Sequence, residues 1–176
     1  MKSKLPEHGN PISTASKVPG RYKKTLSVLN DLIRVNIDRI TAYEKVAHED
    51  KKTGVEIRDI FYRMATESRS YVNDLHAEII HLGGAPVTQS TITGKLYLHW
   101  LNGKVNFDGE TLASLLTACI RGEEAVQQIY LHALEEEQLP ENIYQLVESQ
   151  IWSLERAHRQ LLRVSADIIA TDINGD

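Results

Sequence analysis

The sequence predicts an all-α fold, a four-helix bundle in which a long crossover containing a short helix joins two antiparallel helical hairpins. Three observations predict it. Beyond residue 24, apolar residues recur at alternating steps of three and four, the period of a helix with one buried face. Breaks rich in glycine and proline divide this pattern into four long segments. About 25 residues separate the second segment from the third, too many for a tight turn.

The first two segments form the first predicted hairpin. We expect one helix from about Thr25 to Lys51 and a second from about Val55 to Leu82. Gly54 should cap the first helix in the left-handed conformation, and Gly83 and Gly84 should cap the second. The apolar positions that we place inward are Leu26, Leu29, Ile33, Ile37, Ile40 and Ala47, followed by Ile57, Phe61, Met64, Tyr71, Leu75 and Leu82.

The last two segments form the second predicted hairpin. The third helix should begin near Asp108, a good N-cap, and reach about Glu137, and Pro140 fits the opening of the fourth. The inward positions are Leu112, Leu116, Cys119, Val126 and Tyr130, followed by Ile143, Val147, Leu154, Leu161, Val164 and Ile168.

The crossover between the hairpins carries apolar residues of its own. Residues 93–105 can form a short helix that buries Leu96, Leu98, Trp100 and Leu101. A long connection lets the second hairpin run in the same sense as the first, in a one-crossover topology. Because the crossover holds more apolar surface than one helix face can bury, we expect a homodimer or higher homo-oligomer. Trp100 and Trp152 are expected to pack the crossover on the bundle or to fill an interface.

The composition is that of a soluble globular protein with one core. The chain has 176 residues, of which 41% are hydrophobic and 25% charged. No apolar run reaches the roughly 18 residues of a membrane span, so no membrane partner is expected. Residues 1–20 lack the apolar segment of a secretory signal. Cys119 is the single cysteine and cannot form an internal disulfide, which fits a cytoplasmic location.

Charge is distributed unevenly along the chain. Residues 1–24 carry a charge of +5, so the rest of a chain with a net charge of −4 carries −9. We expect residues 1–22 to form a disordered basic arm, because they bury too little surface to offset ordering entropy, and residues 23–172 to form the bundle. The arm is either a solubilising leader or a tail that touches nucleic acid. Since the acidic body repels phosphate, nucleic acid is not an expected partner.

Several runs, in this order, resemble one known family: "LNDLIRVNIDRITAYEKVA", "HAEIIHLGGAP", "GKLYLHWL", "CIRGEEAV" and "ERAHRQL". Over about residues 25–168 the chain resembles the bacterial ferritin-like four-helix-bundle family of unknown function that was first noted in Pseudomonas. The resemblance implies the ferritin-like fold. It implies no reaction, because that family has no settled activity.

Glu123 is the first candidate for a functional residue. A ferritin-type di-metal centre takes a Glu from each of two helices and a Glu-x-x-His motif from each of the other two. Glu123 falls on the apolar stripe of the third helix, between Cys119 and Val126. An unpaired buried carboxylate costs several kcal/mol, so Glu123 should be paired, protonated or bound to a metal. Its partner can equally be Arg121, Arg69 or a tyrosine hydroxyl.

The fourth helix supplies a complete Glu-x-x-His motif in Glu155 and His158. The predicted turn near residue 139 places Glu155 level with Glu123, where the two side chains of the motif can hold one ion. The neighbouring Arg156 and Arg159 favour the alternative that the pair lies on a solvated face.

The first hairpin supplies fewer candidate metal ligands than the second. Glu67 is followed three residues on by Ser70 instead of histidine, and Thr41 stands where a Glu would serve. Asp38 and Glu44 are the substitutes. The sequence therefore predicts a degenerate site that holds either no metal or a single weakly bound iron or zinc ion. The candidate ligands are Glu123, Glu155, His158 and Glu67.

The sequence is compatible with three alternative functions. The first, which we favour, is a non-enzymatic ferritin-like bundle of unknown role, acting in stress physiology or as an assembly module. The second is an iron-binding or di-iron oxidase-like bundle, and the third is a DNA-protecting protein that resembles miniferritins with basic arms. The chain has no glycine-rich phosphate loop, Cys-x-x-Cys pair or nucleophile elbow.

Overall fold

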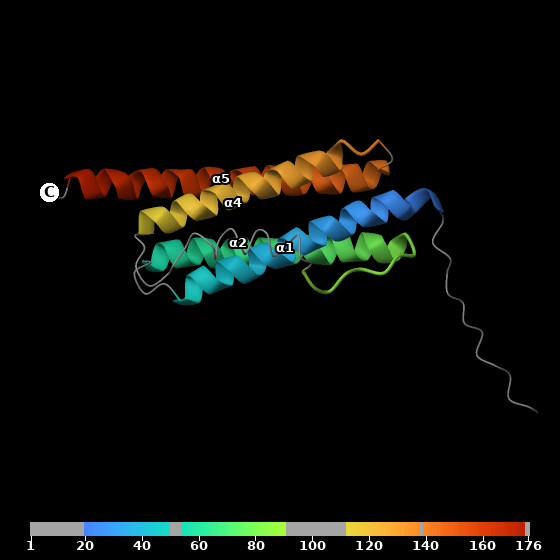
Figure 1. The fold of residues 1–176 in the computed structure, drawn as a ribbon, viewed down its shortest axis with the longest axis horizontal. Helices are drawn as coiled ribbons and strands as arrows, with labels where there is room; N and C mark the ends of the chain where they lie inside the picture. Colours follow the sequence, from blue (N-terminus) through green and yellow to red (C-terminus); the bar gives the residue numbers. More distant parts are fainter. Residues whose placement is uncertain (1–19, 50–53, 91–111, 138, 175–176) are drawn as a thin grey trace, which may run out of the picture.

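The computed structural model describes residues 20–49, 54–90, 112–137 and 139–174, and within these ranges it contains helices and turns but no strand (Figure 1). A 3-10 turn, Gly20–Tyr22, leads into the first helix. The helices are α1 (Lys23–Glu49), α2 (Val55–His81), α4 (Leu112–Leu134) and α5 (Glu141–Asn174). The all-α prediction is confirmed, with helix boundaries close to those expected.

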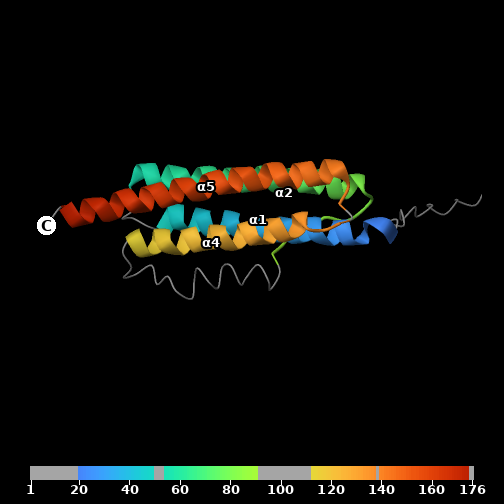
Figure 2. The same cartoon turned by 90° about the horizontal axis from the view of Figure 1, so that it is seen from above.

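Each of these four described helices packs against two of the others. Both α1 and α5 pack against α2 and α4, so that α1 lies diagonal to α5 and α2 diagonal to α4. Figure 1 shows the same arrangement as two layers, one made by the α1–α2 hairpin and the other by the α4–α5 hairpin, and Figure 2, seen from above, shows α5 along α2 and α4 along α1. The four helices thus form a four-cornered bundle around one core.

The two hairpins turn at opposite ends of the bundle (Figure 1). The end of α2 and the start of α4 also lie at opposite ends, so α4 runs parallel to α2 and antiparallel to α1. The expectation that both hairpins run in the same sense is therefore wrong. Among α1, α2, α4 and α5, every pair of neighbouring helices is antiparallel, an arrangement that sets opposite helix dipoles side by side.

Glycine residues mark both ends of α2. The Gly84 N–H donates to the Ile79 carbonyl and the Gly83 N–H to the Ile80 carbonyl, each at 2.9 Å, and Gly83 has a φ of 77°. This is a Schellman cap, and it confirms the predicted stop. Gly54 instead has a φ of −60° and a ψ of 159° and is the N-cap of α2. The prediction of a left-handed Gly54 is wrong because this glycine begins the second helix instead of ending the first.

Replacing Gly83 by alanine should lower the free energy of unfolding by about 1–2 kcal/mol, because a Cβ is strained in the left-handed conformation. Urea denaturation measures the effect. Gly20→Ala is the control, since a Cβ there would meet no atom within 4 Å, and it should change stability by less than about 0.5 kcal/mol. Equal losses in the two variants would contradict the role of the cap.

The core confirms the predicted inward positions of α2, α4 and α5, which are buried or pack against buried residues. The prediction for α1 is wrong at Ile40, which is half-buried and is not among the residues that pack against the core, whereas Ile37 does pack against it. The fully buried side of α1 includes instead four residues with no exposed surface, two of them polar: Leu32, Asn36, Arg39 and Tyr43. Together with the correctly predicted Leu29, Ile33 and Ala47, these residues face the interior of the bundle.

Several predictions fall outside the described residues. They concern residues 1–19 of the basic arm, the short helix at 93–105 with its oligomer surface, and the N-cap at Asp108. No helix in the described part of the chain combines the length and the apolar character that a membrane crossing requires.

Candidate functional site

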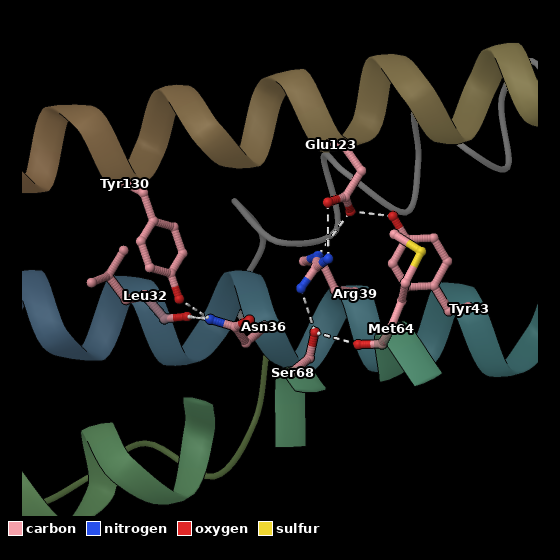
Figure 3. Close-up of polar contacts among 8 residues, drawn as sticks. All are labelled: Leu32, Asn36, Arg39, Tyr43, Met64, Ser68, Glu123 and Tyr130. Carbon is pink, nitrogen blue, oxygen red and sulfur yellow. Dashed lines mark hydrogen bonds and ion pairs between the residues drawn. The ribbon is translucent and has the colours of Figure 1, made fainter. Parts of the chain in front are cut away.

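The centre of the bundle holds a buried ion pair between α1 and α4 (Figure 3). Arg39 Nε lies 2.8 Å from Glu123 Oε1, and Arg39 Nη2 lies 2.9 Å from Glu123 Oε2. Neither side chain exposes any surface. The planar guanidinium donates to both oxygens of the planar carboxylate, the geometry that gives the strongest ion pairs in proteins. The pair joins the two hairpins at mid-bundle.

Two hydroxyl groups also form hydrogen bonds with this ion pair. Arg39 Nη1 donates to Ser68 Oγ of α2 at 2.6 Å, and the Ser68 hydroxyl donates to the Met64 carbonyl at 3.1 Å. Tyr43 donates its hydroxyl to Glu123 Oε1. Removing two charges from water costs several kcal/mol per ion unless hydrogen bonds satisfy their remaining groups. These hydroxyls provide such bonds, so the charges are stabilised from three helices.

A second polar layer lies one turn of α1 away. Asn36 Nδ2 donates to the Leu32 carbonyl at 2.8 Å and to the Tyr130 hydroxyl at 2.7 Å. The Tyr130 hydroxyl donates in turn to Gln150 Oε1 at 2.9 Å. Asn36 lies on α1, Tyr130 on α4 and Gln150 on α5, and all three are buried. A single tyrosine hydroxyl therefore links three helices.

Two weakly acidic groups on α4, Cys119 and Tyr130, stay neutral. Burial raises the pKa of the Cys119 thiol far above its ordinary value, and the negative charge of Glu123 raises it further. Burial likewise raises the pKa of Tyr130, while its hydrogen bond with Asn36 lowers it in part. Cys119 is a core residue, as predicted. Neither group supplies an anion for nucleophilic chemistry at neutral pH.

Glu155 and His158 lie on α5 with partners other than Glu123. Glu155 Oε2 is 3.6 Å from Arg159 Nη1, and the Glu155 side chain is 36% exposed. His158 Nε2 is 3.7 Å from Glu124 Oε1, and its side chain is 16% exposed. The Glu155–Arg159 contact agrees with the alternative that this part of the motif lies on a solvated face.

Glu67 lies on the side of α2 that contacts α5. Its side chain is half-buried, one helical turn before Tyr71. Burial raises the pKa of Tyr71, a hydrogen bond with Ser153 of α5 lowers it in part, and the negative charge of Glu67 raises it further. The charges of Glu67 and Glu123 thus both act on Tyr71, whereas His158 contacts Glu124 of α4.

The four candidate ligands are thus not brought together. Among the described residues, no group of three or more His, Cys, Asp or Glu side chains is placed to hold a metal ion. A ferritin-type centre does not fit the residues at mid-bundle, because Arg39 donates to both oxygens of Glu123, the central candidate ligand. The weaker expectation, a single loosely bound iron or zinc ion, stays a prediction. Its ligands remain Glu123, Glu155, His158 and Glu67.

Asp38, a substitute ligand on α1, is buried. Burial raises the pKa of its carboxyl group above 3.8, and a hydrogen bond with Ser90 lowers it in part. Since the folded state holds the proton more tightly than the unfolded state, this residue makes the fold less stable as the pH rises from 3.8 through its folded pKa.

Asp38→Asn should therefore raise the free energy of unfolding at neutral pH, because an amide carries no charge to desolvate. The gain should disappear as the pH falls below 3.8, where the carboxyl group is protonated in both states. Urea denaturation at a series of pH values measures it. Asp31→Asn, a change at an exposed aspartate on the same helix, is the control and should show no such gain. A gain at Asp38 that does not change with pH would contradict this cause.

Arg39, Ser68 and Gln150 were not predicted from the sequence as central residues. A usable signal was present in α1, where Asn36, Arg39 and Tyr43 follow one another at steps of three and four. This spacing places them on one helix face.

The alternative partners suggested for Glu123 have different outcomes. The tyrosine hydroxyl is confirmed in Tyr43. Arg69 instead pairs with Glu44 of α1, and its side chain is 47% exposed. Arg121 is exposed on the outside of α4. The cation that neutralises Glu123 is thus Arg39, from the other hairpin.

One family of proteins is similar to this chain over more than half of its length. Residues 24–136 match the sequence profile of a family described as Domain of unknown function (DUF2383). The chain belongs to this family. No curated protein matches the chain.

The DUF2383 match runs from the start of α1 to just beyond the end of α4. It includes the whole ion-pair network, Arg39, Tyr43, Ser68 and Glu123, whereas Gln150 on α5 lies outside it. The segment that defines the DUF2383 family in this chain is therefore the segment that builds the buried ion pair.

Proposed function

We propose that this DUF2383 protein is a non-enzymatic, ferritin-like bundle in which a buried ion pair stands where a ferritin-type bundle holds metal. The topology supports the ferritin-like part of the proposal, because two antiparallel hairpins are joined between the parallel helices α2 and α4. Glu123 lies at mid-bundle, where the ligands of ferritin-type metal centres lie, and this supports the proposal that the ion pair stands in the place of the metal.

One observation carries the proposal: the bidentate contact of Arg39 with Glu123. Arginine keeps its charge at every pH a protein meets, so the guanidinium satisfies the carboxylate permanently. A divalent ion at Glu123 would have to displace this cation or lie beside it with both charges desolvated. Both alternatives are costly in a buried site.

The same contacts favour a structural role. The ion pair and its hydroxyl partners are buried, so a substrate has no direct access to them. The bundle instead gains a rigid centre that fixes how the two hairpins meet. A protein of this kind serves as an assembly module, and its outer faces carry the function.

Metal analysis of the full chain, purified without a chelating tag, tests the proposal. We expect well below one equivalent of iron or zinc per chain, and no change in His158→Ala. Because the His158 side chain is only 16% exposed, the exchange should also lower stability by about 1 kcal/mol through lost packing. Two equivalents of iron with oxygen-dependent oxidation would overturn the proposal in favour of an iron-binding or oxidase-like bundle.

A further inference from the structure

The outer side of α5 carries a stripe of seven residues. The buried side of this helix includes Ile143, Val147, Leu154 and Leu161, which expose 1% of their surface or less. At about 100° per residue, seven positions between residues 141 and 163 cluster on the opposite side of the helix. These positions, which we call the α5 outer stripe, are Glu141, Gln145, Glu148, Trp152, Arg156, Arg159 and Arg163. Among the described elements, α5 packs only on α2 and α4.

Trp152 stands at the middle of the α5 outer stripe and is 61% exposed. Tryptophan combines a large apolar surface with few rotatable bonds, and it is enriched at the centres of protein interfaces. It has no apolar neighbour within the stripe. Its exposure indicates a surface that a partner covers.

Residues of opposite charge lie on the two sides of Trp152 at matching distances along the stripe. Glu148, Gln145 and Glu141 precede it by 4, 7 and 11 residues, and Arg156, Arg159 and Arg163 follow it by 4, 7 and 11 residues. One half of the stripe is therefore acidic and the other basic, with matching spacing.

The helix dipole does not account for this arrangement. It favours acidic residues in the first turn of a helix and basic residues in the last. Glu148 and Arg156 lie well inside a 34-residue helix, where the effect has faded. The contacts that these stripe residues make within the chain are local and exposed, such as Arg156 with Ser153 at 3.2 Å and Arg159 with Glu155 at 3.6 Å.

We infer that the α5 outer stripe binds a second copy of this chain in a two-fold dimer. An axis through Trp152 sets the two α5 helices antiparallel and brings the two indole rings together. It places Arg156 opposite Glu148 of the other copy and Arg163 opposite Glu141, and each pair occurs twice. A parallel pairing would place arginine against arginine. The stripe spans about 33 Å at 1.5 Å per residue.

Charge reversal tests the pairing by sedimentation of the full chain over a range of concentrations. The wild type should form a dimer of twice the 19.9 kDa chain mass. Glu148→Arg and Arg156→Glu should each weaken the dimer about tenfold, because each reverses two ion pairs. The double variant should return to within about threefold of the wild type, since the charges again match across the axis. Arg121→Glu, an exposed reversal on α4, should have no effect.

Truncation tests the centre of the stripe. Trp152→Ala should weaken the dimer about 30-fold, as expected for a central aromatic residue. Ile80→Ala, which removes an apolar side chain 64% exposed on α2, should leave it unchanged. Circular dichroism should show the same helix content in every variant, because none of these side chains belongs to the core. A monomer at all concentrations would overturn the inference. A dimer whose affinity is unchanged by the single charge reversals would also overturn it. The same holds for a double variant that dimerises as weakly as the single variants.

Discussion

Replacing Arg39 by methionine is expected to lower the free energy of unfolding at neutral pH by about 3–5 kcal/mol. The change leaves the Glu123 carboxylate fully buried with Tyr43 as its remaining partner. An ion without a counter-ion in the protein interior forfeits its hydration and gains little in return. Methionine keeps an unbranched apolar stem at this position, so packing contributes less to the loss than charge does. Urea denaturation of the two proteins measures the difference.

A double variant distinguishes the cost of leaving one buried charge unpaired from the cost of removing the whole ion pair. Arg39→Met combined with Glu123→Leu should regain most of the lost stability, because replacing both charges of a buried pair by apolar groups is often neutral or stabilising. Arg69→Met is the matched control, since Arg69 pairs with Glu44 on the surface and its side chain is 47% exposed. That change should cost less than about 1 kcal/mol. An equal cost at Arg39 and Arg69 would contradict the central role of the buried pair.

Tyr130→Phe is expected to lower the free energy of unfolding by about 2 kcal/mol. The hydroxyl accepts a hydrogen bond from Asn36 and donates one to Gln150, and both amides are buried. Its removal leaves one donor and one acceptor without these partners, and each such buried group costs about 1–3 kcal/mol. Guanidinium denaturation measures the change.

Tyr62→Phe is the control for this exchange, because the Tyr62 side chain is exposed and its hydroxyl lies 3.4 Å from His48 Nδ1, too far for a strong hydrogen bond. It should change stability by less than about 0.5 kcal/mol. A loss at Tyr130 no greater than that at Tyr62 would show that solvent or neighbouring groups satisfy the two amides.

The fold could be predicted because its signals are local. Apolar spacing defined α2, α4 and α5, and the glycine pair after Leu82 marked a chain stop that needs a left-handed residue. The sense of the second hairpin could not be predicted in the same way. It depends on which helices become neighbours across the core, and no single segment carries that information.

The centre of the bundle shows where apolar spacing is insufficient. Glu123 was identified because a carboxylate interrupts an apolar stripe, and this reasoning holds. Arg39 was not identified, because an arginine on a helix is usually exposed and two isoleucines nearby, Ile37 and Ile40, suggested a different buried face. Only the pairing of the two charges makes the burial of Arg39 favourable, and the partners lie on different hairpins. A pattern read along one helix cannot reveal such a pairing.

The separation of Arg39 and Glu123 along the chain bears on the order of folding. The two residues are 84 positions apart, whereas each hairpin is made from contacts between helices that follow one another closely. Each hairpin can therefore assemble while its own charged residue is still hydrated. Docking of the hairpins then removes water from both ions in the same step and stabilises them only when the guanidinium and the carboxylate are aligned. We expect this late step to limit the speed of folding and to reject hairpins that meet in the wrong alignment.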